Sequence, residues 1–150
     1  MTLYDILSKM PIFARFSDEE KRAISEIEHS IHKYRRGDQI IEEGEHSTSL
    51  YLLVKGAVLI TKKIDEATIR LARLGPGEIF GEMSFFTDQP RRTSVMANDK
   101  VLVMKMDEDF FDSLEPRVKD KIKDYIISLL IERLDKMNDS IMQISRTMPF

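Results

Sequence analysis

The 150-residue chain contains no cysteine and no tryptophan, and it has only six glycines and five prolines. Without cysteine it can form no disulfide, thiolate metal site or iron–sulfur cluster. Its apolar runs are shorter than the roughly 20 residues of a membrane helix. The N-terminus, MTLYDILSKMPIF, lacks the basic start and the small-residue cleavage site of a signal peptide. These absences predict a cytoplasmic protein without a membrane segment.

The charge balance is mildly acidic. The chain has 26 acidic and 23 basic residues, a net charge of −3, so no overall positive field attracts nucleic acid or anionic lipid. Hydrophobic residues make up 42% and charged residues 33%, which is typical of a folded globular protein. The length suits one domain with a full core. We therefore predict a single domain over residues 1–150 that binds no nucleic acid.

Three zones of different patterning divide the chain. Residues 1–30 have helical spacing, with a capping box from Ser17 to Glu20. Residues 31–106 alternate apolar and polar side chains between glycine turns, which indicates short antiparallel strands that close into a barrel or roll. Residues 107–150 are helical again. This order predicts an α+β fold that is mainly β.

A helix of about 30 residues is predicted to begin at Pro116 and to run to about Ser145. We expect its first apolar face to pack on the roll: Val118, Ile122, Tyr125, Ile126 and Leu129. A second face has heptad spacing: Ile127, Leu130, Leu134, Met137, Ile141 and Ile144. A monomer would leave this seam partly in water, so we predict a homodimer through it. The alternative is a helix that lies wholly along its own barrel.

Residues 80–97, FGEMSFFTDQPRRTSVMA, place one acid, Glu82, ahead of a Pro-Arg-Arg turn. Gly81 leaves the backbone open to a ligand, and a short helical turn after it would direct N–H groups at an anion. Arg91, fixed by Pro90, can hold a phosphate through charge-assisted hydrogen bonds. A carboxylate accepts hydrogen bonds from sugar hydroxyls. The pattern indicates a nucleotide site, and its alternative is a solvated charged turn between strands.

The stretch FGEMSFFTDQPRRTSV resembles the phosphate-binding cassette of cyclic nucleotide-binding domains of the catabolite activator protein and protein kinase A regulatory subunit type. The rest of the chain resembles that family's N-terminal helices, β-roll and C-terminal helices in order: LSKMPIFARFSDEEKRAI, RRGDQIIEEGE, SLYLLVKGAVLI, LGPGEIFGEMS and MDEDFFDSLEP. The resemblance implies an antiparallel β-roll of jelly-roll type with N-terminal helices, a cassette at 80–95 that contains a short helix, and a long C-terminal helix.

The resemblance also implies a ligand, cAMP or alternatively cGMP. Glu82 would bind the ribose 2′-hydroxyl and Arg91 the cyclic phosphate. Further pocket positions are Gly81, Met83, Ser84, Arg92, Thr93 and Asn138. Arg92 departs from the small residue common in the family, so it either adds a phosphate contact or points outward. Asn138, on the long helix, is expected to contact the base.

Catalytic and metal chemistry find little support in the sequence. The histidines, His29, His32 and His46, lack further ligands for a metal site. Neither Ser84 nor Thr93 has an evident partner base. We therefore predict neither an enzyme nor a metal site, and a cupin-like enzyme is only a distant alternative.

The expected function is regulatory. Transcription factors of the family carry a helix-turn-helix domain after the long helix, and no such segment follows before Phe150. We expect nucleotide binding to be transmitted through Phe110, Phe111 and the seam to a dimer partner or an effector protein. The main alternative is a ligand-free scaffold with a degenerate pocket.

Overall fold

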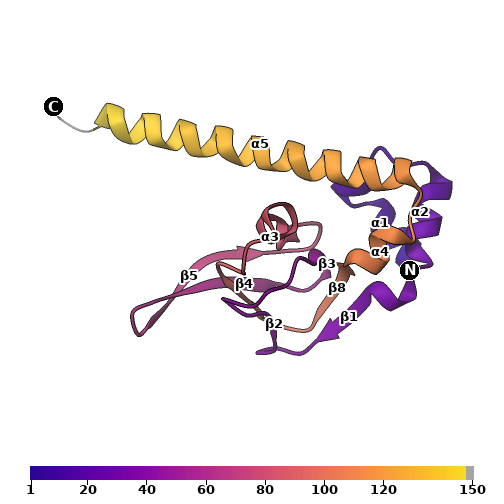
Figure 1. Cartoon of the computed structure of the whole chain (residues 1–150), viewed down its shortest axis with the longest axis horizontal. Helices are drawn as coiled ribbons and strands as arrows, with labels where there is room; N and C mark the ends of the chain where they lie inside the picture. The colour runs from indigo at the N-terminus through magenta and orange to yellow at the C-terminus, as the bar shows by residue number, and fades with distance from the viewer. Residues whose placement is uncertain (148–150) are drawn as a thin grey trace.

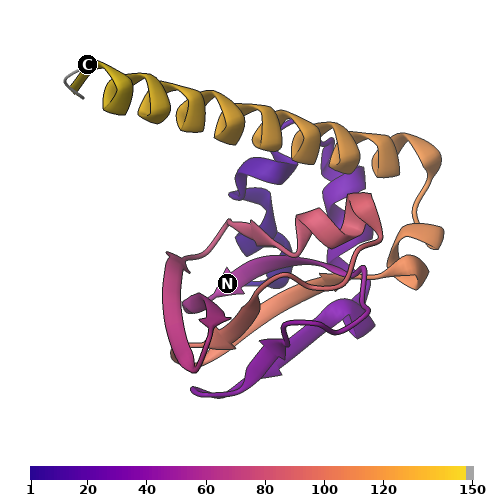
Figure 2. The same cartoon turned by 60° about the vertical axis from the view of Figure 1, so that its left-hand side comes forward.

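The computed structural model describes residues 1–147, apart from the side chain of Glu28; residues 148–150 of the predicted domain lie outside the described range. A β-roll forms the centre, short helices cover part of it, and one long helix, α5 (Pro116–Thr147), runs past them all (Figures 1 and 2). The predicted fold, mainly β with helices at both ends of the sequence, is confirmed.

Short helices precede the first strand: α1 (Leu3–Ser8), η1 (Pro11–Phe13), α2 (Asp18–Ser25) and η2 (Glu28–Ser30). Helix α2 begins with the predicted capping box, in which the Glu20 backbone N–H donates to Ser17 Oγ and the Ser17 N–H donates to the Glu20 carboxylate. Thr2 and Asp5 form the same arrangement at α1. Local capping thus fixes both helix starts.

The strands form two four-stranded antiparallel sheets. The first has the order β1 (Ile31–Tyr34), β8 (Val101–Met106), β3 (Leu50–Lys55) and β6 (Ile79–Phe80). The second has the order β2 (Gln39–Ile41), β7 (Ser94–Ala97), β4 (Val58–Ile64) and β5 (Ala67–Leu74). All the pairings are antiparallel, as the turn chemistry of this zone predicted.

Strand β3 separates two apolar cores. Its even-numbered residues Leu50, Leu52 and Val54 belong to the core between the first sheet and the helices. Tyr51 and Leu53, which point to the opposite face of the strand, belong to the core inside the roll. The strand is therefore apolar on both faces because both faces are covered.

The C-terminal zone begins with α4 (Glu108–Asp112), where Asp107 Oδ1 accepts a hydrogen bond of 2.9 Å from the Phe110 N–H. On α5 the first predicted face is buried, with Val118, Ile122 and Ile126 in the core between the first sheet and the helices. Its main neighbour is the short helix η1 and not, as predicted, the roll. Tyr125 and Leu129 are partly buried against the same core. An ion pair of 2.6 Å between Lys121 Nζ and Glu20 joins α5 to α2.

The predicted seam lies on the solvent side of α5. Its residues are 45–60% exposed: Ile127, Leu134, Met137, Ile141 and Ile144. Leu130 differs, because it is partly buried against the helical core. Within residues 1–147, no helix combines the length and the hydropathy needed to span a bilayer.

Two glycines with positive φ differ in the space around them, so their substitution separates backbone strain from close packing in the turns of the roll. Gly44 and Gly56 have φ of +92° and +87°, but only at Gly56 would an added Cβ overlap a neighbour, the carbonyl oxygen of Lys100. We expect Gly44→Ala to cost about 1–2 kcal/mol through backbone strain alone. Gly56→Ala should cost about 1–3 kcal/mol more through overpacking. Urea unfolding of both variants measures the difference, and equal costs would contradict the close packing of the Gly56 turn.

Candidate functional site

The connection between β6 and β7 contains the short helix α3 (Glu82–Thr87). Gly81 precedes it with φ of +85°, and Asp88 ends it with φ of +57°. A Cβ on Gly81 would lie 2.9 Å from both Arg91 Nη1 and the Ser49 carbonyl oxygen. Gly81 therefore serves two purposes, because it takes a left-handed conformation and allows a guanidinium to approach the backbone.

That guanidinium belongs to Arg91, which is 4% exposed. Its Nη1 donates to the Gly81 carbonyl at 3.0 Å, and its Nη2 donates to the Ser49 carbonyl at 2.6 Å and to Ser47 Oγ at 3.3 Å. Burial lowers the pKa of Arg91 below its ordinary value, although an arginine stays charged at neutral pH. Its Nε is buried and has no hydrogen-bond partner among the described residues. Three of the five guanidinium N–H donors are thus bonded, and Nε is a buried nitrogen without a partner.

Glu82, the first residue of α3, pairs with the long helix. Its Oε1 accepts a hydrogen bond of 2.6 Å from Arg133 Nη1 on α5, and the Glu82 and Arg133 side chains are 15% and 40% exposed. The sequence reasoning missed Arg133. It continues the buried face of α5 by steps of three and four residues after Leu129 and Leu130, at the point where that face changes from apolar to charged.

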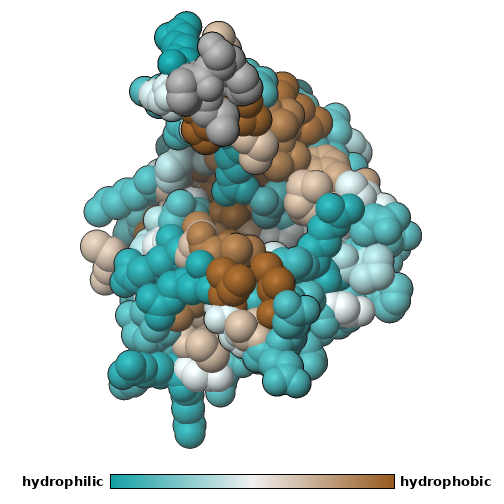
Figure 3. Space-filling view, turned by 90° about the vertical axis from the view of Figure 1, so that its left-hand side faces the viewer, coloured by the Kyte–Doolittle hydropathy of each residue, from teal (hydrophilic) through white to brown (hydrophobic). Residues whose placement is uncertain are grey.

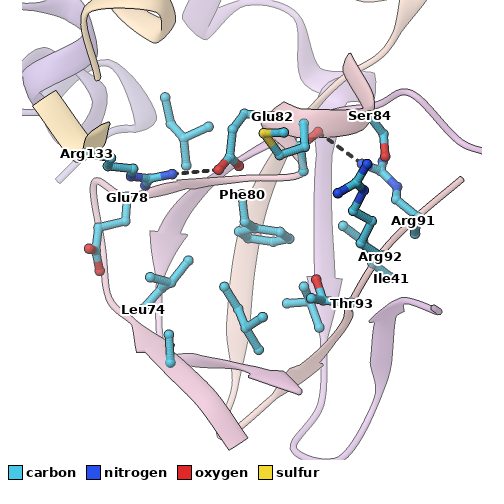
Figure 4. A pocket seen from close by; sticks show the side chains of 16 residues that line it. Ile41, Leu74, Glu78, Phe80, Glu82, Ser84, Arg91, Arg92, Thr93 and Arg133 are labelled. Carbon is cyan, nitrogen blue, oxygen red and sulfur yellow. Dashed lines mark hydrogen bonds and ion pairs between the residues drawn. The ribbon is translucent and has the colours of Figure 1, made fainter. Parts of the chain in front are cut away.

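These groups border one cavity of about 570 Å³. Figure 4 shows the Glu82–Arg133 pair at one side of it and Arg91 at the other, with Phe80 between them. Apolar side chains form much of the remaining wall: Ile41, Ile60, Ala72, Leu74, Ile79 and Val95. The cavity has the usual composition of a small-molecule site, an apolar wall with a few convergent polar groups.

The floor of the cavity is rigidly backed. The Phe80 ring stacks on Tyr51 with centroids 5.0 Å apart and planes within 3°. Tyr51 is buried, and this burial raises its pKa to about 12, so its hydroxyl is neutral at physiological pH. An aromatic pair in offset or parallel contact contributes about 0.5–1.5 kcal/mol beyond its buried area.

The Pro-Arg-Arg turn is also held by a contact from strand β4. Lys62 Nζ on β4 donates to the Arg92 carbonyl at 2.8 Å and pairs with Glu43 at 3.4 Å. The Arg92 side chain is exposed but lines the cavity. The charged lining consists of three arginines and two glutamates, a balance of one positive charge: Arg91, Arg92, Arg133, Glu78 and Glu82.

The structure brings seven of the eight predicted ligand positions to this cavity: Gly81, Glu82, Met83, Ser84, Arg91, Arg92 and Thr93. Asn138 is exposed on α5 and is not among the lining residues. α5 contributes Arg133 instead. The individual ligand contacts, including the one proposed for Asn138, remain predictions. In the described part of the chain, no three His, Asp or Glu side chains are grouped as metal ligands.

Comparison with known proteins identifies the family of the chain. The family model for the cyclic nucleotide-binding domain matches residues 31–115. The regulatory subunit of cAMP-dependent protein kinase from Aspergillus fumigatus is 33% identical over 114 residues, which are 76% of this chain and 27% of the relative. The chain thus spans about a quarter of the length of the curated kinase subunits that it matches.

Two solved structures share the fold. A cyclic nucleotide-binding domain from Methylobacillus flagellatus is 27% identical, with a TM-score of 0.74, and the match covers 99% of this chain and 84% of that one. The catabolite activator protein of Thermus thermophilus is also 27% identical with a TM-score of 0.74, over 90% of this chain and 63% of that one. Both the predicted family and the β-roll are therefore confirmed.

The two neighbouring arginines should differ in their effect on stability. Arg91→Met removes the 2.6 Å hydrogen bond to the Ser49 carbonyl and leaves the Gly81 carbonyl only its 3.4 Å bond from the Phe85 N–H. We therefore expect a loss of about 2–4 kcal/mol in the free energy of unfolding. Arg92→Met changes an exposed side chain, so its effect should stay within about 0.5 kcal/mol. Urea denaturation measures both values. A neutral Arg91→Met would show that the buried guanidinium does not support the cassette.

Proposed function

The chain belongs to the cyclic nucleotide-binding domain family, and we propose that it binds a cyclic nucleotide in the cavity beside α3, with cAMP as the expected ligand and cGMP as the second candidate. The observation that carries this proposal is the buried Nε of Arg91, a charged donor without a partner in the cavity wall. A buried donor of this kind is costly unless it is bonded. A phosphate oxygen would bond it, and the single positive charge of the lining matches one phosphodiester.

The other end of the cavity suits a sugar. The Glu82 carboxylate has two oxygens, and only Oε1 bonds to Arg133. A carboxylate accepts several hydrogen bonds, so a ribose hydroxyl can bond to Oε2 or take the place of Arg133. The apolar wall between the two ends offers a surface for a purine. This arrangement accounts for the opposite charges of Glu82 and Arg91 at separate ends of one cavity (Figure 4).

We propose a regulatory and non-catalytic role, which the name of the Aspergillus relative supports. Two contacts link the cassette to the C-terminal helices: the Glu82–Arg133 ion pair and the packing of Phe85 on Phe111, with centroids 5.2 Å apart. A nucleotide that engages Glu82 changes the environment of Arg133. Its binding can shift α4 and α5 only as far as its affinity differs between their two positions.

The receiver of this change is, in our proposal, a second copy of the chain or an effector protein bound to α5. The seam places apolar side chains along the solvent side of the helix, and Figure 3 shows hydrophobic surface on α5 and again on the part of the roll below it. Heptad spacing is the pattern by which two helices pack together. Burial of this seam in a dimer would remove it from water. In the alternative, a ligand-free scaffold, the same seam would bind the partner and the cavity would bind no nucleotide.

Calorimetric titration with cAMP, cGMP and a cyclic dinucleotide tests the ligand. We expect binding of a cyclic mononucleotide, weakened about 10- to 100-fold by Arg91→Lys, because lysine keeps the charge but loses the planar fork and its Nε. Arg73→Lys, an exposed position of β5 outside the cavity lining, is the matched control and should leave the affinity unchanged. Folded protein that gives no heat with any of the three would contradict the proposal and favour the scaffold.

Multi-angle light scattering tests the seam. We expect a dimer at micromolar concentration, and a monomer after Leu134→Lys with Ile141→Lys, because two charges would be buried in the interface. Ile64→Lys with Leu71→Lys removes equally exposed apolar residues of the β4–β5 hairpin and should leave the dimer intact. A wild-type protein that is strictly monomeric would reject the homodimer, whatever its affinity for nucleotide.

A further inference from the structure

A second cavity, of about 550 Å³, lies at the end of the roll where the β1–β2, β3–β4 and β7–β8 turns meet. Backbone hydrogen bonds hold these turns together, from the Gly37 N–H to the Ala97 carbonyl and from the Asn98 N–H to the Ala57 carbonyl. Figures 1 and 2 show the β1–β2 turn on the side of the roll away from α5. We call this cavity the basic groove, and it is lined by Lys33, Tyr34, Arg35, Asp38, Lys55, Lys100, Val101 and Leu102.

The basic groove begins where the helical cover of the first sheet ends. Leu102 and Met104 of β8 lie two residues apart, so they share one face of the sheet. Met104 is fully buried in the helical core, whereas Leu102 is only partly buried at its edge. Lys33 on β1 lies in register with Leu102. Lys55 on β3 also pairs with Leu102, because the register of β3 shifts between Leu53 and Lys55. Both lysines are exposed. An apolar side chain thus lies at the centre of a row with a cation on each side, roughly 5 Å per strand away.

The charges around the basic groove are one-sided. Its lining holds four cations and one carboxylate, that of Asp38, which already accepts a hydrogen bond of 2.7 Å from the Arg35 backbone N–H. None of the ion pairs found within residues 1–147 includes Lys33, Arg35, Lys55 or Lys100. The chain as a whole is acidic, with a net charge of −3. This local excess of three positive charges is larger than that of the cavity beside α3, and it favours an anionic partner.

We propose that the basic groove is the docking site for an acidic segment of a partner protein that places an apolar side chain over Leu102 and carboxylates beside Lys33 and Lys55. The apolar floor, which is the partly exposed side chain of Leu102, selects this occupant. A polyphosphate or a nucleic acid backbone would use the cations and leave that floor in water. An acidic peptide with an aliphatic residue uses both, and it extends the layer that the helices form over the rest of the sheet.

Fluorescence anisotropy with a labelled 12-residue probe, three repeats of Glu-Glu-Leu-Glu, tests the groove. We expect saturable binding that weakens at least about tenfold in the double variant Lys33→Glu with Lys55→Glu, since the charges would then repel. The matched control reverses two exposed charges of the β4–β5 hairpin, Lys63→Glu with Arg73→Glu, and should stay within about twofold of wild type. Thermal melting verifies that both variants fold.

A second probe, with serine in place of every leucine, isolates the apolar contact, and an oligothymidylate of 12 nucleotides represents nucleic acid. Both should bind at least about tenfold more weakly than the leucine peptide. Leu102→Ser should remove the preference for leucine over serine. The proposal is overturned if wild type does not bind the leucine peptide, if both double variants bind it equally, or if the serine peptide or the oligonucleotide binds as tightly.

Discussion

The cassette depends on the buried guanidinium of Arg91. A charge removed from water is costly unless hydrogen bonds replace its hydration. Here the replacements come from Gly81, ten residues before Arg91, and from Ser47 and Ser49, more than 40 residues before it. The guanidinium therefore ties the start of α3 to the segment before β3. Gly81 is a consequence of this contact, because a Cβ there would lie 2.9 Å from Nη1. Nε has no hydrogen-bond partner among the described residues, so its N–H can bond to something outside the chain.

The two ends of the cavity are held by different parts of the fold. At one end, Arg91 is bonded to the segment before β3, and Lys62 fixes the Arg92 carbonyl from β4. At the other end, Glu82 is bonded to Arg133 of α5, which is half-exposed and has no other contact of this kind in the described chain. A ligand that spans both ends therefore joins a rigid site to a helix. This asymmetry gives a physical route from occupancy of the cavity to the position of α5.

Short-range sequence patterns predicted the helices and strands, whereas contacts between residues far apart in the sequence determined which side chains line the cavity. The capping box at Ser17 and the antiparallel strands follow from short-range patterns, and the family resemblance located the cassette. Arg133 was missed because nothing near it in the sequence shows that its partner is Glu82, a contact between residues 51 positions apart. Leu130 matched the heptad by spacing but packs on the helical core. Asn138 was predicted from the position along the long helix at which the family resemblance implies a base contact. In the structure its side chain is exposed, and it does not line the cavity.

Net charge was the least informative property of the sequence, because the charges are sorted by location. Acidic residues occupy the first turns of α2 and α4, where they stabilise the helix dipoles and cap the N-termini. The cavity beside α3 and the basic groove both carry an excess of cations in their linings. In the net charge of the chain, the acidic residues at the helix starts therefore cancel the two local excesses of cations. The net charge predicts only that no overall positive field attracts nucleic acid or anionic lipid. It does not predict these local excesses of cations, since exposed charges act over about 10 Å at moderate ionic strength.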